Sequence, residues 1–272
     1  MNHLIVIGDS RSMYEVNDES IHLIITSPPY WNLKTYPKNE FQLGNINDYF
    51  LFLRELNKVW NECFRVLVPS GRLCVIVGDI CLSRRKYGRH RLIPFHADVI
   101  HSCLRVGFDY LAPIIWYKIT NVSTEVKRKT YILGNPRGPN SIVKNEIEYI
   151  LLFRKPGPYR KPTKEQVNLS RLTKCEYVEY FRQIWKLKGE NKVGHPAPFP
   201  LKLAERLIKM FSYVGDYVLD PFLGSGTTTL AAINCDRQSI GYEVEPTYLE
   251  LIKERLRRET TKNYKLEIKI RK

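Results

Sequence analysis

The sequence predicts an α/β fold built on a doubly wound, mostly parallel sheet, for two reasons. Short apolar runs rich in β-branched residues recur along the chain, first at residues 3–7, 21–25 and 72–77. Between them, apolar residues are spaced at three- and four-residue steps, which is the period of an amphipathic helix. Buried strands that alternate with such helices are typical of parallel sheets covered by helices on both faces.

The first half of the chain is expected to place two helices between its strands. The first helix should begin at Asn47 or Asp48, which are good capping residues, and should stop at the turn formed by residues 69–71. A second helix is expected over 93–104, followed by a strand over 108–117. The apolar face of the first helix is predicted to consist of Phe50, Leu53, Trp60, Phe64 and Leu67.

The middle of the chain interrupts this alternation and is strongly basic. Residues 121–145 are rich in Gly, Pro, Asn, Lys and Arg, a strand is expected over 146–153, and residues 155–191 mix Lys and Arg with aromatic residues. Of the net charge of +15, +10 lies in residues 118–192, where 17 Lys and Arg face 7 Asp and Glu. These two segments could be solvent-exposed loops or a surface that contacts the phosphates and bases of a nucleic acid. The aromatic residues interleaved with Lys and Arg favour the nucleic-acid surface.

The last third returns to alternating elements and contains a strand, turn, helix and strand that suit a nucleoside. The expected elements are a helix opened by 198–200, strands over 217–220 and 239–243, and helices over 229–235 and 246–257. The strand that ends at Asp220 leads into Gly224-Ser225-Gly226, where glycines allow the backbone to approach a ligand closely. The next strand ends at Glu243, 23 residues after Asp220, where an acidic residue commonly binds ribose hydroxyls.

The segment Thr26-Ser27-Pro28-Pro29-Tyr30 follows an expected buried strand and therefore lies at its carboxyl end. Two consecutive prolines fix the backbone and leave carbonyls free to accept hydrogen bonds. The Ser27 hydroxyl, the Pro28 carbonyl and the Tyr30 ring would suit a flat base with an exocyclic amino group. A strand-ending turn with a core tyrosine is the alternative.

Cysteine usage and hydropathy narrow the class of protein. The six cysteines form no C-x-x-C pair and no cluster with histidine, so we expect reduced thiols and no metal site. Neither a signal peptide nor an apolar run long enough to span a bilayer is recognised, which favours a cytoplasmic protein without a membrane partner. Cys74, Trp31 and His195 are expected to be structural.

Taken together, the segments 26–30 and 220–228 resemble the motifs of the S-adenosylmethionine-dependent amino-group DNA methyltransferases of restriction-modification systems. Residues 195–200 also resemble the family segment that precedes the cofactor motif. The catalytic motif comes first and the cofactor motif near the carboxyl end, which is similar to the permuted order of the β class. The resemblance implies a Rossmann-like methyltransferase fold in which the strands that end at Asp220 and Glu243 are neighbours.

The resemblance also implies a role for each matching residue. The target base would be held by Ser27, Pro28, Pro29 and Tyr30. The cofactor S-adenosyl-L-methionine would contact Asp9, Phe199, Pro200, Asp220, Pro221, Phe222, Gly224, Ser225, Gly226, Thr227 and Glu243. In this set, Glu243 would hold the ribose and Asp9 would lie near the adenine. Candidate DNA contacts in the basic segment are Arg137, Arg160, Lys161 and Lys164.

The chain would then divide into four parts. Residues 1–119 would form the catalytic half, 120–192 a strand and a basic target-recognition insertion, 193–260 the cofactor-binding half, and 261–272 a basic tail. Duplex DNA is the expected partner, with a cognate restriction endonuclease acting separately.

Family members that methylate adenine mostly have Asp or Asn before the two prolines, and those that act on cytosine mostly have Ser. Ser27 therefore predicts methylation of the N4 amino group of cytosine, with no covalent enzyme intermediate. Adenine-N6 methylation is the first alternative. An RNA methyltransferase and a non-catalytic nucleic-acid-binding module are less favoured alternatives.

Overall fold

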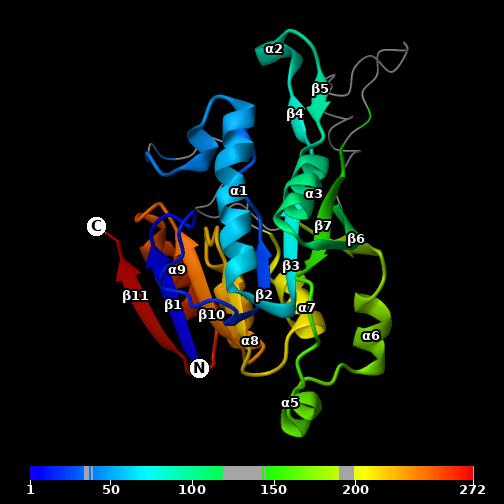
Figure 1. Ribbon diagram of the computed structural model, residues 1–272, viewed down its shortest axis with the longest axis vertical. Coiled ribbons are helices and arrows are strands. Elements are labelled where there is room, and N and C mark those ends of the chain that lie inside the picture. The colour runs from blue at the N-terminus through cyan, green and yellow to red at the C-terminus, as the bar shows by residue number, and fades with distance from the viewer. Residues whose placement is uncertain (34–36, 38, 119–142, 144, 190–198, 272) are drawn as a thin grey trace.

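The computed structural model describes residues 1–271 except 34–36, 38, 119–142, 144 and 190–198. The described residues form one nine-stranded sheet with helices on both faces (Figure 1). In spatial order the strands are β11 (Lys265–Ile270), β1 (Asn2–Ile7), β10 (Gln238–Glu243), β9 (Tyr217–Asp220), β2 (Ile21–Thr26), β3 (Leu67–Val77), β7 (Ile147–Arg154), β6 (Asp109–Lys118) and β8 (Ile184–Leu187).

The sheet is parallel apart from β7, which runs antiparallel to both β3 and β6. The predicted doubly wound, mostly parallel α/β fold is therefore confirmed. Strand β9 lies between β10 and β2: Asp220 is in register with Gly241, and Val218 with Leu23. Segments from the two ends of the chain thus finish side by side at one edge of the sheet, which we call the carboxyl edge.

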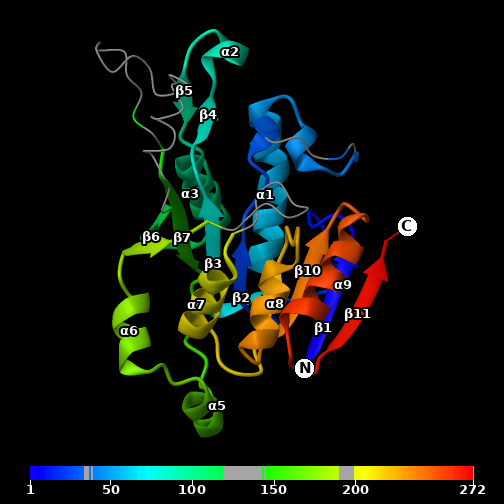
Figure 2. The same ribbon diagram turned by 180° about the vertical axis from the view of Figure 1, so that it is seen from behind.

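Helices cover both faces of the sheet (Figures 1 and 2). Helices α1 (Tyr49–Val66) and α3 (Phe95–Val106) bury Trp60, Phe52 and Phe95 against the first face. The second face is covered by α7 (Leu201–Phe211), α8 (Thr227–Asn234) and α9 (Tyr248–Glu259). None of the helices in the described part of the chain is long and apolar enough to cross a membrane.

Helix α1 shows where the predicted periodicity was wrong. Asp48 caps the helix by accepting a hydrogen bond from the Leu51 backbone N–H at 2.6 Å, as expected. Phe50, however, is 79% exposed, whereas Phe52 and Leu56 are buried. Since Phe50 lies about 200° around the helix from Phe52, the two cannot share a face.

The end of α1 also differs from the prediction. The helix stops at Val66, and β3 begins at once with Leu67, so the expected turn at 69–71 lies inside a strand. Ser70 adopts a positive φ of 61°, and its backbone N–H donates to the Lys155 carbonyl at 2.9 Å. The irregular start of β3 is therefore stabilised by the backbone of Lys155, which follows β7.

Several elements were not predicted. After β3 the chain forms a hairpin of β4 (Ile80–Leu82) and β5 (Arg91–Ile93) around the one-turn helix α2 (Arg84–Tyr87). The 3₁₀ turns η1 (Trp31–Leu33) and η2 (Leu43–Asn45) follow β2.

The basic segment after β7 is also more ordered than predicted, because it contains α5 (Lys164–Leu169), α6 (Lys174–Tyr180) and strand β8. Both helices begin with a capping box, at Thr163 with Gln166 and at Thr173 with Glu176. Residues 265–270, expected to be a basic tail, pair in parallel with β1 as strand β11.

Candidate active site

A pocket that is partly open to solvent lies at the carboxyl edge of the sheet. It is lined by Asp9, Ser10, Ser27, Pro28, Pro29, Tyr30, Phe41, Gln42, Leu43, Pro221, Phe222, Gly224, Tyr242, Glu243, Val244 and Tyr248. Most of these residues lie at or just after the ends of β1, β2, β9 and β10, whose carboxyl ends meet at this edge. In open parallel sheets, ligands bind in such crevices outside the carboxyl ends of the strands.

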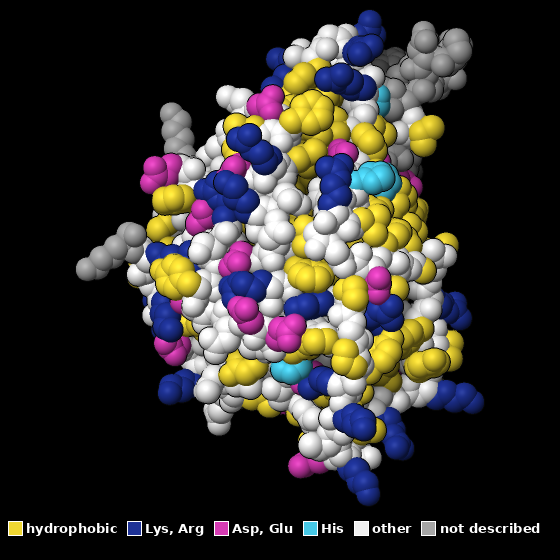
Figure 3. All heavy atoms as spheres, viewed as in Figure 1, with side chains coloured by type: hydrophobic (Ala, Val, Ile, Leu, Met, Phe, Trp, Pro, Cys, Tyr) yellow, Lys and Arg dark blue, Asp and Glu magenta, His cyan; other side chains and the backbone are white. Residues whose placement is uncertain are grey.

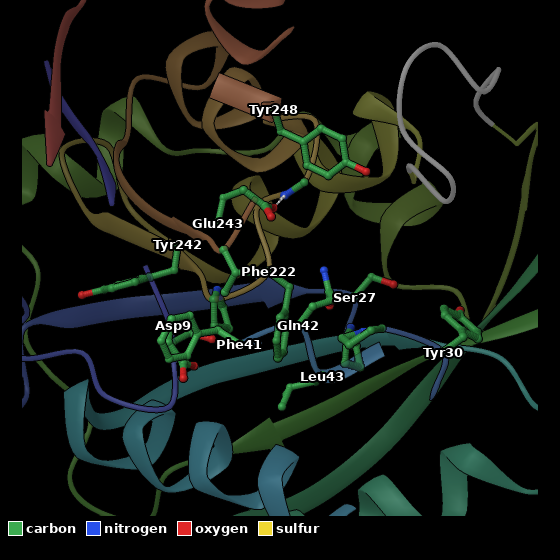
Figure 4. A pocket seen from close by; sticks show the side chains of 16 residues that line it. Asp9, Ser27, Tyr30, Phe41, Gln42, Leu43, Phe222, Tyr242, Glu243 and Tyr248 are labelled. Atoms are coloured by element: carbon green, nitrogen blue, oxygen red, sulfur yellow. Dashed lines mark hydrogen bonds between the residues drawn. The ribbon is translucent and has the colours of Figure 1, made fainter. Parts of the chain in front are cut away.

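The segment after β2 forms one end of the pocket. Tyr30 lies at this end, Asp9 and Phe41 lie at the other, and Ser27 lies between them (Figure 4). Tyr30 is buried and its ring meets Phe95 of α3 edge-on, with 6.1 Å between ring centroids. The next residue, Trp31, is also buried and packs edge-on against Tyr49, so its assignment to the core is confirmed.

Glu243 ends β10 and is almost fully buried beside the pocket. Its two carboxylate oxygens accept hydrogen bonds from the backbone N–H groups of Gly224, at 2.8 Å (Figure 4), and Glu245, at 2.9 Å. Burial nevertheless raises the pKa of Glu243 to about 7, because desolvation of the charged form outweighs the two amide donors. This side chain therefore changes its charge near neutral pH.

Asp220 ends β9, but its carboxylate does not face the pocket. It accepts hydrogen bonds from Thr26 Oγ1 at 2.8 Å, Thr228 Oγ1 at 2.6 Å and the Phe222 backbone N–H at 3.0 Å. Burial raises its pKa to about 6. Because Thr26 directly precedes Ser27, this carboxylate joins the end of β2 to the glycine turn after β9. This arrangement gives Asp220 a positioning role, and its expected contact with the cofactor stays a prediction.

The conformation of the turn 224–226 explains why glycine is required at its last position. Gly226, with φ of 79°, precedes α8, and a Cβ at this position would approach Ile252 Cγ2 of α9 within 2.8 Å. Ser225 and Thr227 do not line the pocket, since their hydroxyl oxygens accept hydrogen bonds from Arg255 Nη1 at 3.0 and 2.8 Å. Of the turn, Gly224 alone lines the pocket, together with the preceding Pro221 and Phe222.

Asp9 lies in the loop after β1 and is held there by two arginines. Its carboxylate accepts hydrogen bonds from Arg11 Nε at 2.7 Å and from the Arg11 backbone N–H at 2.9 Å. Its backbone carbonyl accepts from Arg271 Nη1, at 2.7 Å, just after β11. The first and last segments of the chain therefore fix one end of the pocket jointly.

The remaining predicted site residues lie elsewhere. Phe199 and Pro200 are buried at the start of α7, where Phe199 packs in the core of the second face, and neither lines the pocket. Arg137 and His195 lie outside the described residues.

The three remaining candidate DNA contacts lie on the opposite side from the pocket. Arg160 forms an ion pair with Asp216, which precedes β9, and stacks on the Tyr213 ring at 4.9 Å. Lys161 and Lys164 flank the start of α5, at the lower end of Figure 1. The sheet separates these residues from the carboxyl edge, so their placement does not support contact with DNA held at the pocket.

The sequence did not indicate seven further lining residues, two of which are Ser10 and Val244. Phe41, Gln42 and Leu43 reach the pocket from the start of η2, and Tyr242 and Tyr248 lie on either side of Glu243 along the chain. Ser10, Tyr242 and Val244 adjoin predicted site residues and could have been suspected. The positions of the segment 41–43 and of Tyr248 depend on how the chain folds back over the sheet and on where α9 begins.

The geometry agrees with the relationships of the chain to known proteins. Residues 21–254 match the family model N6_N4_Mtase, described as DNA methylase. The chain belongs to this DNA methylase family. A curated relative, the type II methyltransferase M.MjaI of Methanocaldococcus jannaschii, is 37% identical over 94% of this chain and 91% of its own length.

Solved structures of DNA methylases and related proteins have the same architecture. TTHA0409 of Thermus thermophilus, solved in complex with S-adenosyl-L-methionine, is 47% identical, covers 98% of each chain and has a TM-score of 0.82. The cytosine-N4-specific PvuII DNA methyltransferase is 22% identical and has a TM-score of 0.68, over 97% of this chain and 89% of its own. At that identity the second likeness shows the fold alone.

Proposed function

We propose that this DNA methylase transfers a methyl group to the N4 amino group of a cytosine flipped out of duplex DNA. The methyl donor is S-adenosyl-L-methionine, as in the related TTHA0409 complex. The observation that most supports the proposal is that Ser27, Pro28 and Tyr30 share one pocket with Gly224 and Glu243. A segment suited to an amino-bearing base and a segment suited to a nucleoside thus open into the same space.

The residues present fit the cofactor. The buried Glu243 carboxylate suits ribose hydroxyls as donors, and Gly224 lets the backbone come close. Phe222, Phe41 and Tyr242 provide apolar and aromatic lining for an adenine ring. When bound, S-adenosyl-L-methionine supplies an electrophilic methyl group on a sulfonium. We assign its adenosine part to the end near Asp9 and Glu243, and its reactive part to the side of Ser27.

The chain's own contribution to catalysis is orientation. An exocyclic amino group is a poor nucleophile because its lone pair is delocalised into the ring. If Ser27 Oγ and the Pro28 carbonyl accept its two N–H groups, they localise that lone pair and aim it at the methyl group. Tyr30, held against Phe95, would stack on the flipped base.

Asp220, Ser225 and Thr227 act indirectly in this proposal, since their side chains bind other protein groups.

The proposal also implies how the chain divides into functional parts. The catalytic half (1–119) and the cofactor half (193–260) both border the pocket, and residues 120–192 remain the proposed target-recognition insertion apart from the part around α5, which lies on the opposite side from the pocket. By analogy with M.MjaI, we propose that the enzyme belongs to a type II restriction-modification system, with a separate endonuclease as its counterpart.

Adenine N6 is the second candidate target, because the family model covers DNA methylases without fixing the base. The discriminating residue in this chain is Ser27, which is smaller than Asp or Asn and can both donate and accept hydrogen bonds. The shape and polarity of the pocket would then select cytosine.

The proposal is tested by measuring incorporation of radiolabelled methyl groups from S-adenosyl-L-methionine into duplex DNA and into RNA of matched sequence. We expect incorporation into duplex DNA only. Incorporation into RNA alone would contradict the DNA assignment. Absence of incorporation together with retained DNA binding would favour a non-catalytic binding module.

A further inference from the structure

A basic hairpin projects from the carboxyl edge of the sheet and lines no part of the pocket described above. It consists of β4, α2 and β5, residues 80–93, and forms the upper tip of the molecule in Figures 1 and 2. No acidic residue lies between Asp79 and Asp98. Its exposed cationic residues are Arg84, Arg85, Lys86, Arg89 and Arg91.

These five charges differ from the cations on the body of the molecule. Among the described residues none of them forms an ion pair, whereas Arg11, Arg65 and Arg154 are each paired with a carboxylate. Figure 3 shows Lys and Arg side chains gathered at this tip. Like charges crowded on so short a hairpin repel one another, so a bound polyanion would relieve that repulsion.

The base of the hairpin is anchored to the wall of the pocket. Ile80 and Leu82 are buried in the same core as Tyr30 and Phe95. A Cβ at Gly78, two residues before the hairpin, would lie 3.6 Å from Tyr30 Cε1. The position of the hairpin is therefore fixed relative to the site proposed for the flipped base.

The hairpin is also internally braced. Ile80 pairs with Ile93 and Leu82 with Arg91 in an antiparallel ladder. His90, which directly precedes β5, places its Nε2 at 3.2 Å from Cys81 Sγ of β4. A two-stranded ribbon of this kind fits the major groove of duplex DNA, and phosphates border that groove on both sides.

We propose that residues 80–93 form a DNA-binding ribbon that contacts backbone phosphates of the duplex beside the flipped base. This inference rests on the proposed function, because it requires a duplex positioned over the pocket. Each β residue advances about 3.3 Å, so the three steps from Ile80 to Ser83 carry the chain about 10 Å from its buried start. The cationic residues that follow, beginning with Arg84, are exposed to a partner at this edge of the sheet.

The test compares two triple variants with the same loss of charge. The first is Arg84→Gln, Arg85→Gln and Arg89→Gln in the hairpin. The matched control is Lys161→Gln, Lys164→Gln and Arg171→Gln, which lie in the basic segment around α5 and form no ion pair within the described part of the chain. Affinity for a fluorescent duplex is measured by anisotropy over a range of salt concentrations, and affinity for S-adenosyl-L-methionine by calorimetry.

For the hairpin variant we expect the log-log salt slope of DNA affinity to fall by about 2–3 and the affinity at 0.1 M salt to fall at least about tenfold. The control should retain both, and all proteins should bind S-adenosyl-L-methionine equally. An unchanged hairpin variant, or an equal loss in the control, would overturn the inference. A wild-type protein that binds no duplex would overturn the proposed function as well. A product other than N4-methylcytosine would affect only the proposed function.

Discussion

At the scale of single residues, the buried carboxylates define the pocket in ways that a motif does not reveal. Sequence motifs indicated Asp220 and Glu243 correctly as neighbouring strand ends. They could not show that Asp220 turns its oxygens toward Thr26 and Thr228, because that depends on side chains from opposite ends of the chain. Nor could they show that burial brings the pKa of Glu243 to about 7.

The raised pKa of Glu243 makes cofactor affinity dependent on pH. Ribose hydroxyls that donate to the carboxylate favour its charged form, so binding should lower this pKa and release protons. Affinity should therefore increase between about pH 5.5 and 8, with a proton released from Glu243 on binding near neutral pH. Calorimetry in two buffers of different ionisation enthalpy measures this release.

The control for that experiment is Glu243→Gln, because the α-amino group of the cofactor also titrates near about pH 8. The difference between wild type and variant isolates the carboxylate. If the two proteins show the same pH dependence, Glu243 does not bind the ribose.

Ser27→Ala tests the proposed orienting contact. Loss of one hydrogen-bond acceptor that acts mainly in the transition state should reduce kcat by about 10²-fold, while the Kd for S-adenosyl-L-methionine changes by less than about twofold. Single-turnover kinetics and calorimetry on the same protein measure the two effects. A loss of cofactor affinity as large as the loss of turnover would argue against this role.

At the scale of elements, predictions succeeded where apolar runs were buried on both faces and failed where they were short or basic. Strand β11 alternates apolar and polar residues from Lys265 to Ile270, so a strand signal was present, but its charge favoured the interpretation as a tail. Likewise, the capping boxes at Thr163 and Thr173 are visible in the sequence and mark the starts of α5 and α6. The hairpin β4–β5 has no such signal.

The end of β11 is expected to stabilise the pocket through Arg271. Its guanidinium donates to the carbonyls of Asp9 and Ser12 and forms an ion pair with the almost buried Glu15. Arg271→Ala should lower the free energy of unfolding by about 3 kcal/mol, because it leaves the Glu15 carboxylate without its cation. Cofactor affinity should fall several-fold as the Asp9 loop loosens.

Urea unfolding and calorimetry measure these two effects. Arg258→Ala is the matched control, since Arg258 is mostly exposed and pairs only at the surface with Glu259. The control should change stability by less than about 0.5 kcal/mol. Equal effects of the two substitutions would show that the Arg271 contacts contribute little.

At the scale of the whole molecule, the order of strands in the sheet brings together two motifs that lie far apart in the sequence. Strand β9, from the last third of the chain, lies between β10 and β2, and so places the cofactor turn beside the segment 26–30. The resemblance of the motifs predicted this neighbourhood. It did not predict that Lys161 and Lys164 lie on the opposite side from the pocket, because net charge along the sequence does not reveal which edge of the sheet a basic segment occupies.

The central claim is that Ser27 and its neighbours present cytosine N4 to the methyl group. Its most direct test is mass spectrometry of nucleosides from duplex DNA methylated by the purified enzyme with S-adenosyl-L-methionine. The account predicts N4-methylcytosine as the product, and its near absence when Ser27→Ala is used. A product that is solely N6-methyladenine would contradict it.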